Sequence, residues 1–291
     1  MTRLLQTLLL AAGLTLGLTP AAGAGEYPHL KMGNPSRAGD GPKHKDNYLM
    51  KKEFFALSYH DSKGTPNWVS WRLVKGDLGS ARRVPFFPDQ TLPRGFSRIH
   101  PNDYTGSGFD RGHMCPHSDR ASSARASTAT FVMTNLIPQA PGVNQKAWAD
   151  LEDYCRHLVA KEPHRLYVVC GPAGKGGDGK NGHRNTIARG KVTVPASCWK
   201  VVMVLPEDGG KDDVEKVFAR TRLIAVIMPN DGSVKHDWPH YRTSVKKVEK
   251  LTGYTFFDRV PAEVINPLKE KVDEVVVRPG RPRPHHKQAD K

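Results

Sequence analysis

Asp110, Arg111 and His113 begin a run of ionisable side chains that continues to Arg120, with a thiol at Cys115 among them. This run has little apolar periodicity, which is typical either of a solvated loop or of a reaction centre. The pKa of imidazole lies close to neutral pH, so a neutral histidine in such a centre could accept a proton from water. The rest of the sequence has to decide between the two interpretations.

A second set of polar residues lies on the clearest predicted helix, residues 144–160. Its apolar side chains recur at intervals of three and four residues and predict one buried face. They are Ala147, Trp148, Leu151, Cys155, Leu158 and Val159. Glu152 and Arg156 lie one turn apart beside this face, and Asn144 begins the helix two turns before Glu152. On their own these three residues indicate a helix cap and a surface ion pair, but they could also project together along one edge of a site.

Three blocks of sequence carry a more specific pattern. Residues 110–113 read Asp-Arg-Gly-His, residues 134–153 contain Asn-Gln-x-x-Trp-x-x-Leu-Glu, and residues 241–257 read YRTSVKKVEKLTGYTFF. Together they resemble the DNA/RNA non-specific endonucleases of the ββα-metal, or His-Me finger, class. The resemblance covers residues 48–265 in order, and it implies a ββα-metal active site.

The resemblance also implies a role for each polar residue. Phosphodiester hydrolysis needs an activated water, stabilisation of charge on the phosphoryl oxygens and help for the departing alkoxide. By resemblance, His113 is the general base, Asn144 binds a divalent cation through its amide oxygen, and Glu152 orders water around that cation. The expected ion is Mg²⁺, with Mn²⁺ as a substitute. Asp110 and Arg111 are expected to brace the loop that bears His113.

Two arginines complete the site that the resemblance implies. Arg156, one turn after Glu152, resembles the arginine that holds the scissile phosphate or the product. Arg82 fits the family's Arg-x-x-x-Phe-x-x-Asp pattern with Phe86 and Asp89, but Arg83 follows it directly and leaves the choice between the two open. A guanidinium suits this role because it donates forked hydrogen bonds to phosphate oxygens.

The charge balance agrees with a polyanionic partner. Lys and Arg number 44 against 29 Asp and Glu, a formal net charge of +15. Such an excess attracts polyanions through long-range fields and counterion release, with nucleic acid as the first candidate and anionic glycans or lipid surfaces behind it. Contacts to phosphate and sugar carry no direct sequence information, so broad cleavage of DNA and RNA is expected. The resemblance implies 5′-phosphate ends.

The two ends of the chain differ in composition from its middle. Residues 1–24 have one cation, an apolar run and small residues before the end, which predicts a secretory signal peptide and a secreted or periplasmic protein with no membrane span in its mature form. Residues 25–47 predict a flexible leader and residues 269–291 a flexible basic tail. The endonuclease domain is therefore expected at residues 48–268.

Short β-rich runs alternate with turn signals through the domain, which predicts an α+β fold around a mixed, largely antiparallel sheet with flanking helices. The expected strands are residues 54–59, 68–73, 130–135, 166–170, 191–194, 199–205 and 223–228. The four cysteines are Cys115, Cys155, Cys170 and Cys198. In an exported protein they predict one or two disulfides, whose pairing the spacing does not choose.

Some alternatives stay open at this point. A basic nucleic-acid-binding protein without catalysis, or a phosphodiesterase acting on small phosphate esters, would share much of this composition. Residues 174–180 approach a phosphate-binding Walker A loop, but Asn181 replaces the required Ser or Thr, so a hairpin loop is expected there. The preference between DNA and RNA, the oligomeric state, a homodimer included, and the existence of an inhibitor are not determined by the sequence.

Overall fold

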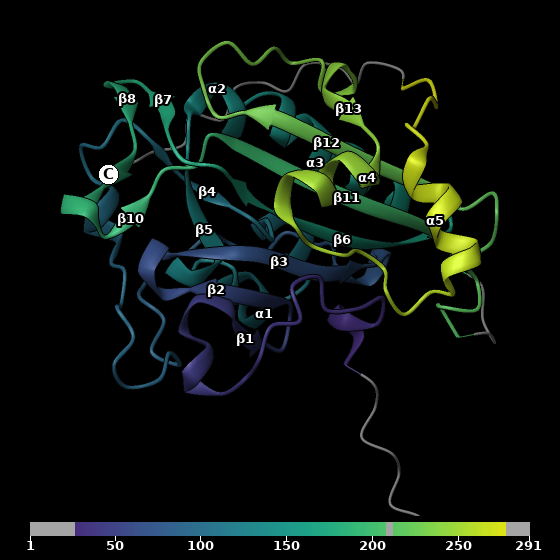
Figure 1. Cartoon of the computed structure of the whole chain (residues 1–291), viewed down its shortest axis with the longest axis horizontal. Helices are drawn as coiled ribbons and strands as arrows, with labels where there is room; N and C mark the ends of the chain where they lie inside the picture. Colours follow the sequence, from purple (N-terminus) through teal and green to yellow (C-terminus); the bar gives the residue numbers. More distant parts are fainter. Residues whose placement is uncertain (1–26, 208–211, 278–291) are drawn as a thin grey trace, which may run out of the picture.

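The computed structural model describes residues 27–207 and 212–277. Its centre is a seven-stranded sheet in the order β1-β2-β3-β6-β11-β12-β13, in which every neighbouring pair is antiparallel (Figure 1). The strands are β1 Tyr48–Lys51, β2 Ala56–His60, β3 Thr65–Leu73, β6 His164–Ala173, β11 Ser197–Pro206, β12 Arg222–Pro229 and β13 Arg242–Thr243. The expected α+β class with a largely antiparallel sheet is therefore confirmed.

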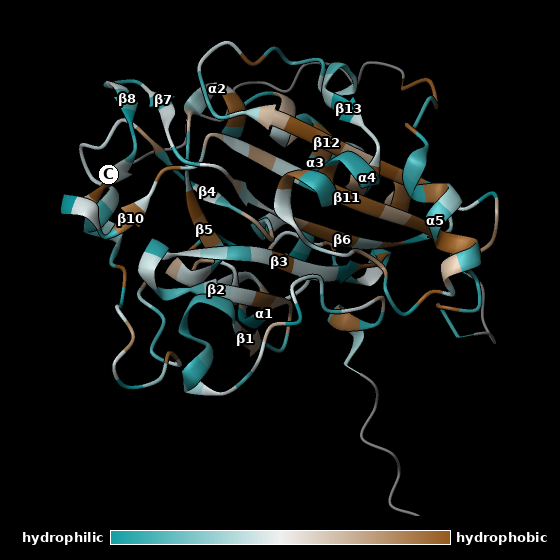
Figure 2. Cartoon of the chain, in the orientation of Figure 1, coloured by the Kyte–Doolittle hydropathy of each residue, from teal (hydrophilic) through white to brown (hydrophobic). Residues whose placement is uncertain are grey.

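Both faces of the sheet are covered. Figure 2 shows the hydrophobic residues concentrated on the central strands β6, β11 and β12. Helix α3, Ala147–Lys161, packs on one face, while α4, Val245–Thr252, and α5, Ala262–Glu270, pack on the other. A sheet buried on both faces needs apolar residues at successive positions, and eight consecutive residues of β11 are buried.

The alternation of side chains along β11 separates two cores. Trp199, Val201, Met203 and Leu205 belong to the core under α4 and α5. Cys198, Val202 and Val204 belong to the core under α3. Because successive side chains of a strand point to opposite faces, Lys200 is also directed to the α3 side.

A ββα unit lies beside the large sheet. Strand β4, Asp110–His113, pairs antiparallel with β5, Leu136–Gln139, so that Asp110 lies opposite Gln139 and His113 opposite Leu136. The short helix α2, Pro141–Asn144, follows β5 at once, and α3 follows α2. The connection from β4 to β5 contains a 3-10 turn, His117–Arg120, and helix α1, Ala124–Ala129.

Two further pairs of short strands complete the fold. Strands β7, Gly177–Gly179, and β8, Gly182–Arg184, form one hairpin. Strands β9, Thr186–Ile187, and β10, Val192–Thr193, form the other. In Figure 1 the β7–β8 hairpin lies at the same end of the molecule as α2.

The expected single helix over residues 144–160 is interrupted. Asn144 is the last residue of α2, and α3 begins at Ala147. The break falls at Lys146, whose φ of −122° and ψ of −111° lie outside the helical region. Asn144 is therefore placed on a separate turn instead of on the helix that carries Glu152.

The expected strand at residues 130–135 is wrong, because the segment turns and its residues Met133–Asn135 form a 3-10 helix. The side-chain amide of Asn135 explains the difference. It accepts a hydrogen bond from the Cys115 backbone nitrogen and donates to the carbonyl oxygens of Cys115 and Thr130. These local bonds take the place of a strand ladder.

The described part of the expected flexible leader is packed instead. Leu30, Met32 and Ala38 are buried in the core under α4 and α5. Trp68 Nε1 donates to Ser36 Oγ over 2.7 Å. The apolar residues of this segment are isolated and show no helix or strand periodicity, so the sequence did not predict their burial. They nevertheless cover this face of the sheet. The predicted signal peptide, residues 1–24, lies outside the described residues.

The described part of the expected tail, residues 269–277, is also held to the fold. Asp273 is buried and accepts two hydrogen bonds of 2.8 Å from Arg222 on β12. This ion pair fixes the segment that follows α5, so the folded domain continues beyond residue 268. Residues 278–291 of the tail lie outside the described residues.

The four cysteines are free thiols and all are buried, so the predicted disulfide is absent from the structure. Burial raises the pKa of the Cys155 and Cys198 thiols to about 12 and raises the pKa of Cys115 and Cys170 as well. Such thiols act as small packing groups. Within residues 27–207 and 212–277, no helix combines the length and apolarity that crossing a membrane requires.

Candidate active site

His113 ends strand β4 and its imidazole lies among aromatic rings. The ring centroid is 5.3 Å from that of Phe86 and 5.1 Å from that of Phe131. Burial, followed by the positive charges of Arg83 and His117, lowers the pKa of His113 to about 3. The imidazole is therefore neutral at physiological pH, as a general base has to be.

One nitrogen of this imidazole has no hydrogen-bond partner. His113 Nε2 is buried and has no hydrogen-bond partner among the described residues, although the residue as a whole is partly exposed. A buried polar atom without a partner costs free energy, so such atoms are rare unless a ligand or water uses them. No hydrogen bond to a described residue therefore occupies this nitrogen.

Asn144 is held by the first residue of the Asp-Arg-Gly-His strand. Its Nδ2 donates to Asp110 Oδ2 over 2.9 Å, and Gln145 Nε2 donates to the same oxygen over 2.8 Å. Because a carboxylate accepts and does not donate, this bond fixes which amide atom of Asn144 is the oxygen. Asn144 Oδ1 accepts no hydrogen bond from the described residues and stays available as a ligand.

The donor set of the site fits a hard cation that keeps most of its water. Within the described ranges, no group of three or more His, Cys, Asp or Glu side chains could hold a metal ion. Mg²⁺ is commonly bound through one or two protein oxygens and several waters, and so needs no protein cage. The fixed and unpaired amide oxygen of Asn144 matches that requirement.

Glu152 lies on α3 against a buried lysine. Its Oε1 is 3.3 Å from Nζ of Lys200, whose side chain is 1 % exposed. The lysine nitrogen also lies 4.0 Å from the ring centroid of Trp148, which favours its charged form. Burial raises the pKa of Glu152, and the positive charge of Lys200 opposes that rise. Burial alone would lower the pKa of Lys200, but Glu152 raises it, so the lysine stays protonated.

Arg156 is braced by two carboxylates. Its Nη1 donates to Asp119 Oδ1 over 2.8 Å and its Nη2 to Asp153 Oδ1 over 2.5 Å. Asp119 comes from the 3-10 turn that follows His113, and its second oxygen accepts a bond of 3.0 Å from Trp71 Nε1. This chain of bonds couples the loop that bears His113 to α3.

The upstream arginines differ in their surroundings. Both are exposed. The guanidinium carbon of Arg83 lies 5.0 Å from the ring centroid of Phe131, which packs on His113. Arg82 contributes its backbone oxygen, which accepts a bond of 2.9 Å from Ser127 Oγ. The structure thus places Arg83, and not Arg82, against the aromatic ring that packs on His113.

Phe86 and Asp89, the other two residues of the Arg-x-x-x-Phe-x-x-Asp pattern, make structural contacts. Phe86 packs on His113. Asp89 is buried and accepts bonds of 2.6 Å from Lys52 Nζ and Thr134 Oγ1. Arg111 donates to the Pro101 carbonyl oxygen over 2.9 Å through Nη2, and thereby ties β4 to the loop before it.

Comparison with known proteins agrees with this geometry. Residues 37–263 match the model of the DNA/RNA non-specific endonuclease family. The chain belongs to that family. Membership makes it a hydrolytic nuclease, and the enzyme expected from the sequence is confirmed.

Relatives of this endonuclease family member extend over most of its length. A nuclease of Nostoc sp. strain PCC 7120 is 46% identical over 246 residues, which are 84% of this chain and 86% of the relative. Nuclease C1 of Cunninghamella echinulata var. echinulata is 31% identical over 82% of this chain and 91% of its own. The solved structure of EndoG in complex with EndoGI shares the fold, with a TM-score of 0.64 at 24% identity over 81% of this chain and 92% of that one.

Sequence reasoning missed two residues that shape the endonuclease site, Lys200 and Asp119. Lys200 is a charged residue in the otherwise apolar strand β11. Because a buried charge needs a partner, its position in the sequence could have indicated a buried ion pair. Asp119 lies inside the ionisable run after His113, but nothing in its spacing points to Arg156. Contacts across such separations depend on the packing of α3 on the sheet.

Proposed function

We propose that this endonuclease hydrolyses phosphodiester bonds of both DNA and RNA in a Mg²⁺-dependent reaction, with His113 as general base and Asn144 as the residue that binds the metal. The observation that supports this most directly is the buried and unpartnered Nε2 of a histidine whose pKa is lowered to about 3. The strand that ends in this histidine also carries Asp110, which orients the amide of Asn144. Mn²⁺ is proposed as a substitute ion because it has similar oxygen ligands.

The proposed hydrolysis has three parts: proton transfer from the attacking water, formation of a bond to phosphorus and departure of the 3′ oxygen. The neutral imidazole of His113 takes a proton from water as the water oxygen forms a bond to phosphorus. The bond from phosphorus to the 3′ oxygen breaks, and that oxygen takes a proton from a water that Glu152 orients, so one end becomes a 3′-hydroxyl and the other keeps a 5′-phosphate. A divalent cation held by Asn144 would supply positive charge beside the phosphoryl and leaving oxygens.

Two groups on α3 support that step in the proposal. Arg156 faces the phosphate with a charge that Asp119 and Asp153 hold in place. Glu152, paired with Lys200, orients water next to the phosphate. Of the upstream arginines, we assign the phosphate contact to Arg83, because it lies next to the ring that packs on His113, with Arg82 beside it.

Broad specificity and export complete the proposal. The net charge of +15 favours any polyphosphate backbone, and such contacts do not distinguish sequences. The pattern of residues 1–24 supports export to the periplasm or the medium. The mature form, which lacks those residues, acts on DNA and RNA there.

The test is digestion of supercoiled plasmid and of single-stranded RNA by the purified mature protein, with Mg²⁺ and with EDTA. We expect both substrates to be cut with Mg²⁺ and neither with EDTA or in the His113→Ala variant. Binding of nucleic acid without scission under all conditions would instead identify a binding protein. Cleavage of small phosphate esters without cleavage of polymers would identify a phosphodiesterase.

A further inference from the structure

The β7–β8 hairpin carries the glycine-rich segment that resembles a phosphate loop, and packing explains its glycines. A Cβ at Gly179 would lie 2.6 Å from the carbonyl oxygen of Gly108, and one at Gly177 would lie 2.8 Å from that of Asn230. Lys180 N also donates to Gly108 O over 2.9 Å. The hairpin is therefore pressed against the loop that leads directly into strand β4.

Asn230 joins this hairpin to α2. Its backbone oxygen accepts a bond of 3.0 Å from Asp178 N. Its side-chain Oδ1 accepts a bond of 2.8 Å from Ala140 N, immediately before α2. Asn230 is 1 % exposed, so both bonds are protected from water. The hairpin and the helix that ends in Asn144 are thus held at a fixed separation.

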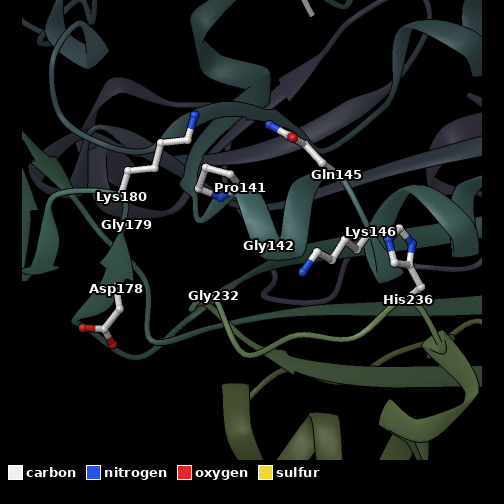
Figure 3. A pocket seen from close by; sticks show the side chains of 9 residues that line it. All are labelled: Pro141, Gly142, Gln145, Lys146, Asp178, Gly179, Lys180, Gly232 and His236. Carbon is white, nitrogen blue, oxygen red and sulfur yellow. The ribbon is translucent and has the colours of Figure 1, made fainter. Parts of the chain in front are cut away.

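A cleft of about 390 Å³ lies between these two elements (Figure 3). Its size falls in the usual range of about 300–1,000 Å³ for ligand sites. Gly142, Gln145 and Lys146 line it from α2 and the turn after it, Gly179 and Lys180 from the hairpin, and Gly232 and His236 from the loop after β12. In Figure 3 the Lys146 amino group points into the space between Gly142 and Gly232.

The lining of the cleft has a positive formal charge, because Lys146 and Lys180 outnumber its one carboxylate, Asp178. The other ionisable residues that line it have partners: His236 Nδ1 lies 3.1 Å from Asp150 Oδ2, and Asp178 Oδ1 lies 3.2 Å from His183 Nδ1. Neither Lys146 nor Lys180 forms an ion pair with any described residue. Two lysines without counterions beside a glycine-lined surface favour a ligand with an extended anionic backbone.

The position of the cleft relates it to the catalytic residues. Lys146 lies two residues after Asn144, and Gln145 donates to the same Asp110 oxygen as Asn144 does. A polynucleotide whose scissile phosphate lies at Asn144 would therefore continue into this cleft. We propose that the cleft binds the phosphate of a neighbouring nucleotide of the substrate strand, with Lys146 and Lys180 as the contacts. This inference rests on the proposed function and names a subsite for its substrate.

The test measures binding in the His113→Ala background, so that the probe stays intact. The probe is a fluorescent single-stranded DNA of about twelve nucleotides, followed by anisotropy in EDTA at several salt concentrations. For Lys146→Gln with Lys180→Gln we expect Kd to rise at least tenfold and the salt slope to fall by about 2, since each lost phosphate contact removes about 1. The matched control is Lys247→Gln with Lys250→Gln, two exposed lysines of α4 on the far side of the sheet.

A steric variant provides an independent measurement. A Cβ at Gly232 would meet no atom within 4 Å, so Gly232→Phe can fill the cleft without disturbing the fold. We expect the same loss of binding, with an unchanged thermal midpoint. If both cleft variants bind as the control pair does, the subsite is wrong even though the unmodified enzyme still cuts plasmid. If the unmodified enzyme cuts nothing while the cleft variants still lose binding, the proposed function fails and the subsite survives.

Discussion

Each face of the large sheet has a buried lysine paired with a glutamate, and the two pairs are built differently. Under α4 and α5, Lys269 Nζ lies 2.7 Å from Glu249 Oε1, which also accepts a bond of 3.0 Å from Phe256 N. Under α3, Lys200 Nζ lies 3.3 Å from Glu152 Oε1, and the second oxygen of Glu152 accepts no hydrogen bond from the described residues.

The difference supports the water-orienting role proposed for Glu152 and a structural role for Glu249. Glu249 has partners at both oxygens, because Oε1 accepts from Lys269 Nζ and Phe256 N, and Oε2 lies 3.5 Å from Lys246 Nζ. It thereby joins α5 to α4 and to the segment before α5. Glu152 is held at one oxygen and keeps hydrogen-bonding capacity at the other. Its pair with Lys200 also lies beside Arg156, whereas the Lys269 pair lies on the opposite face of the sheet. Burial of a charged pair is costly in both places, but only one of them leaves a group free for chemistry.

The largest expected effect follows from removing His113, the proposed general base. His113→Ala should lower the rate of plasmid nicking by about 10²–10⁴-fold, the usual contribution of such a group. The matched control is His157→Ala, an exposed histidine on α3. Nicking by His113→Ala at the rate of the control would remove the histidine from the mechanism.

Glu152→Gln and Glu249→Gln test the comparison directly. Glu152→Gln should lower activity by about 10–100-fold, because a group that orients water at a metal typically contributes that much. Glu249→Gln should keep activity but lower the free energy of unfolding by about 3 kcal/mol, since it leaves Lys269 buried without its counter-charge. Nicking rates and urea denaturation measure the two effects. The reverse pattern would contradict the assignment of both pairs.

Lys200→Met tests whether Lys200 controls the pKa of Glu152. Lys200 opposes the rise that burial causes in the pKa of Glu152, so its removal should raise that pKa further. The carboxylate would then ionise only at higher pH, and the acid limb of the pH–rate profile should move upward, with about a tenfold loss of activity at neutral pH. Lys269→Met should leave the profile in place.

A second variant separates this effect from misfolding. Glu152→Gln with Lys200→Met leaves no charge at the buried pair, so the unfolding midpoint should recover relative to Lys200→Met while activity stays low. Recovery of activity together with stability would show that Lys200 matters for folding alone.

The last expected effect appears only below neutral pH and concerns the stability of the fold. The pKa of His113 is lowered to about 3 in the folded protein from an ordinary value of 6.5. Below 6.5 the unfolded chain binds a proton that the folded chain does not, so the contribution of His113 to stability is lost as pH falls from 6.5 toward 3. Urea denaturation of His113→Gln should show a shallower loss over that range. Identical slopes would mean that the imidazole titrates normally.

The sequence by itself indicated the candidate reacting groups and determined the type of scaffold. The Asp-Arg-Gly-His and Asn-Gln-x-x-Trp patterns are local, and the α+β class follows from short alternating runs, so neither depends on knowing the packing. Six of the seven expected strands appear near their predicted positions. The free thiols, the packed segment at residues 27–39 and the break between Asn144 and Ala147 were not predicted.

Only the tertiary structure decided which partner each charge has. Lys200 meets Glu152 because the alternation of β11 directs it toward α3, and Asp119 meets Arg156 because the turn after β4 packs on that helix. These partners are separated by 48 and 37 positions in the chain. Local propensities fix the shape of each element, but contacts at such separations follow from how the elements bury their apolar faces, which is a property of the whole fold.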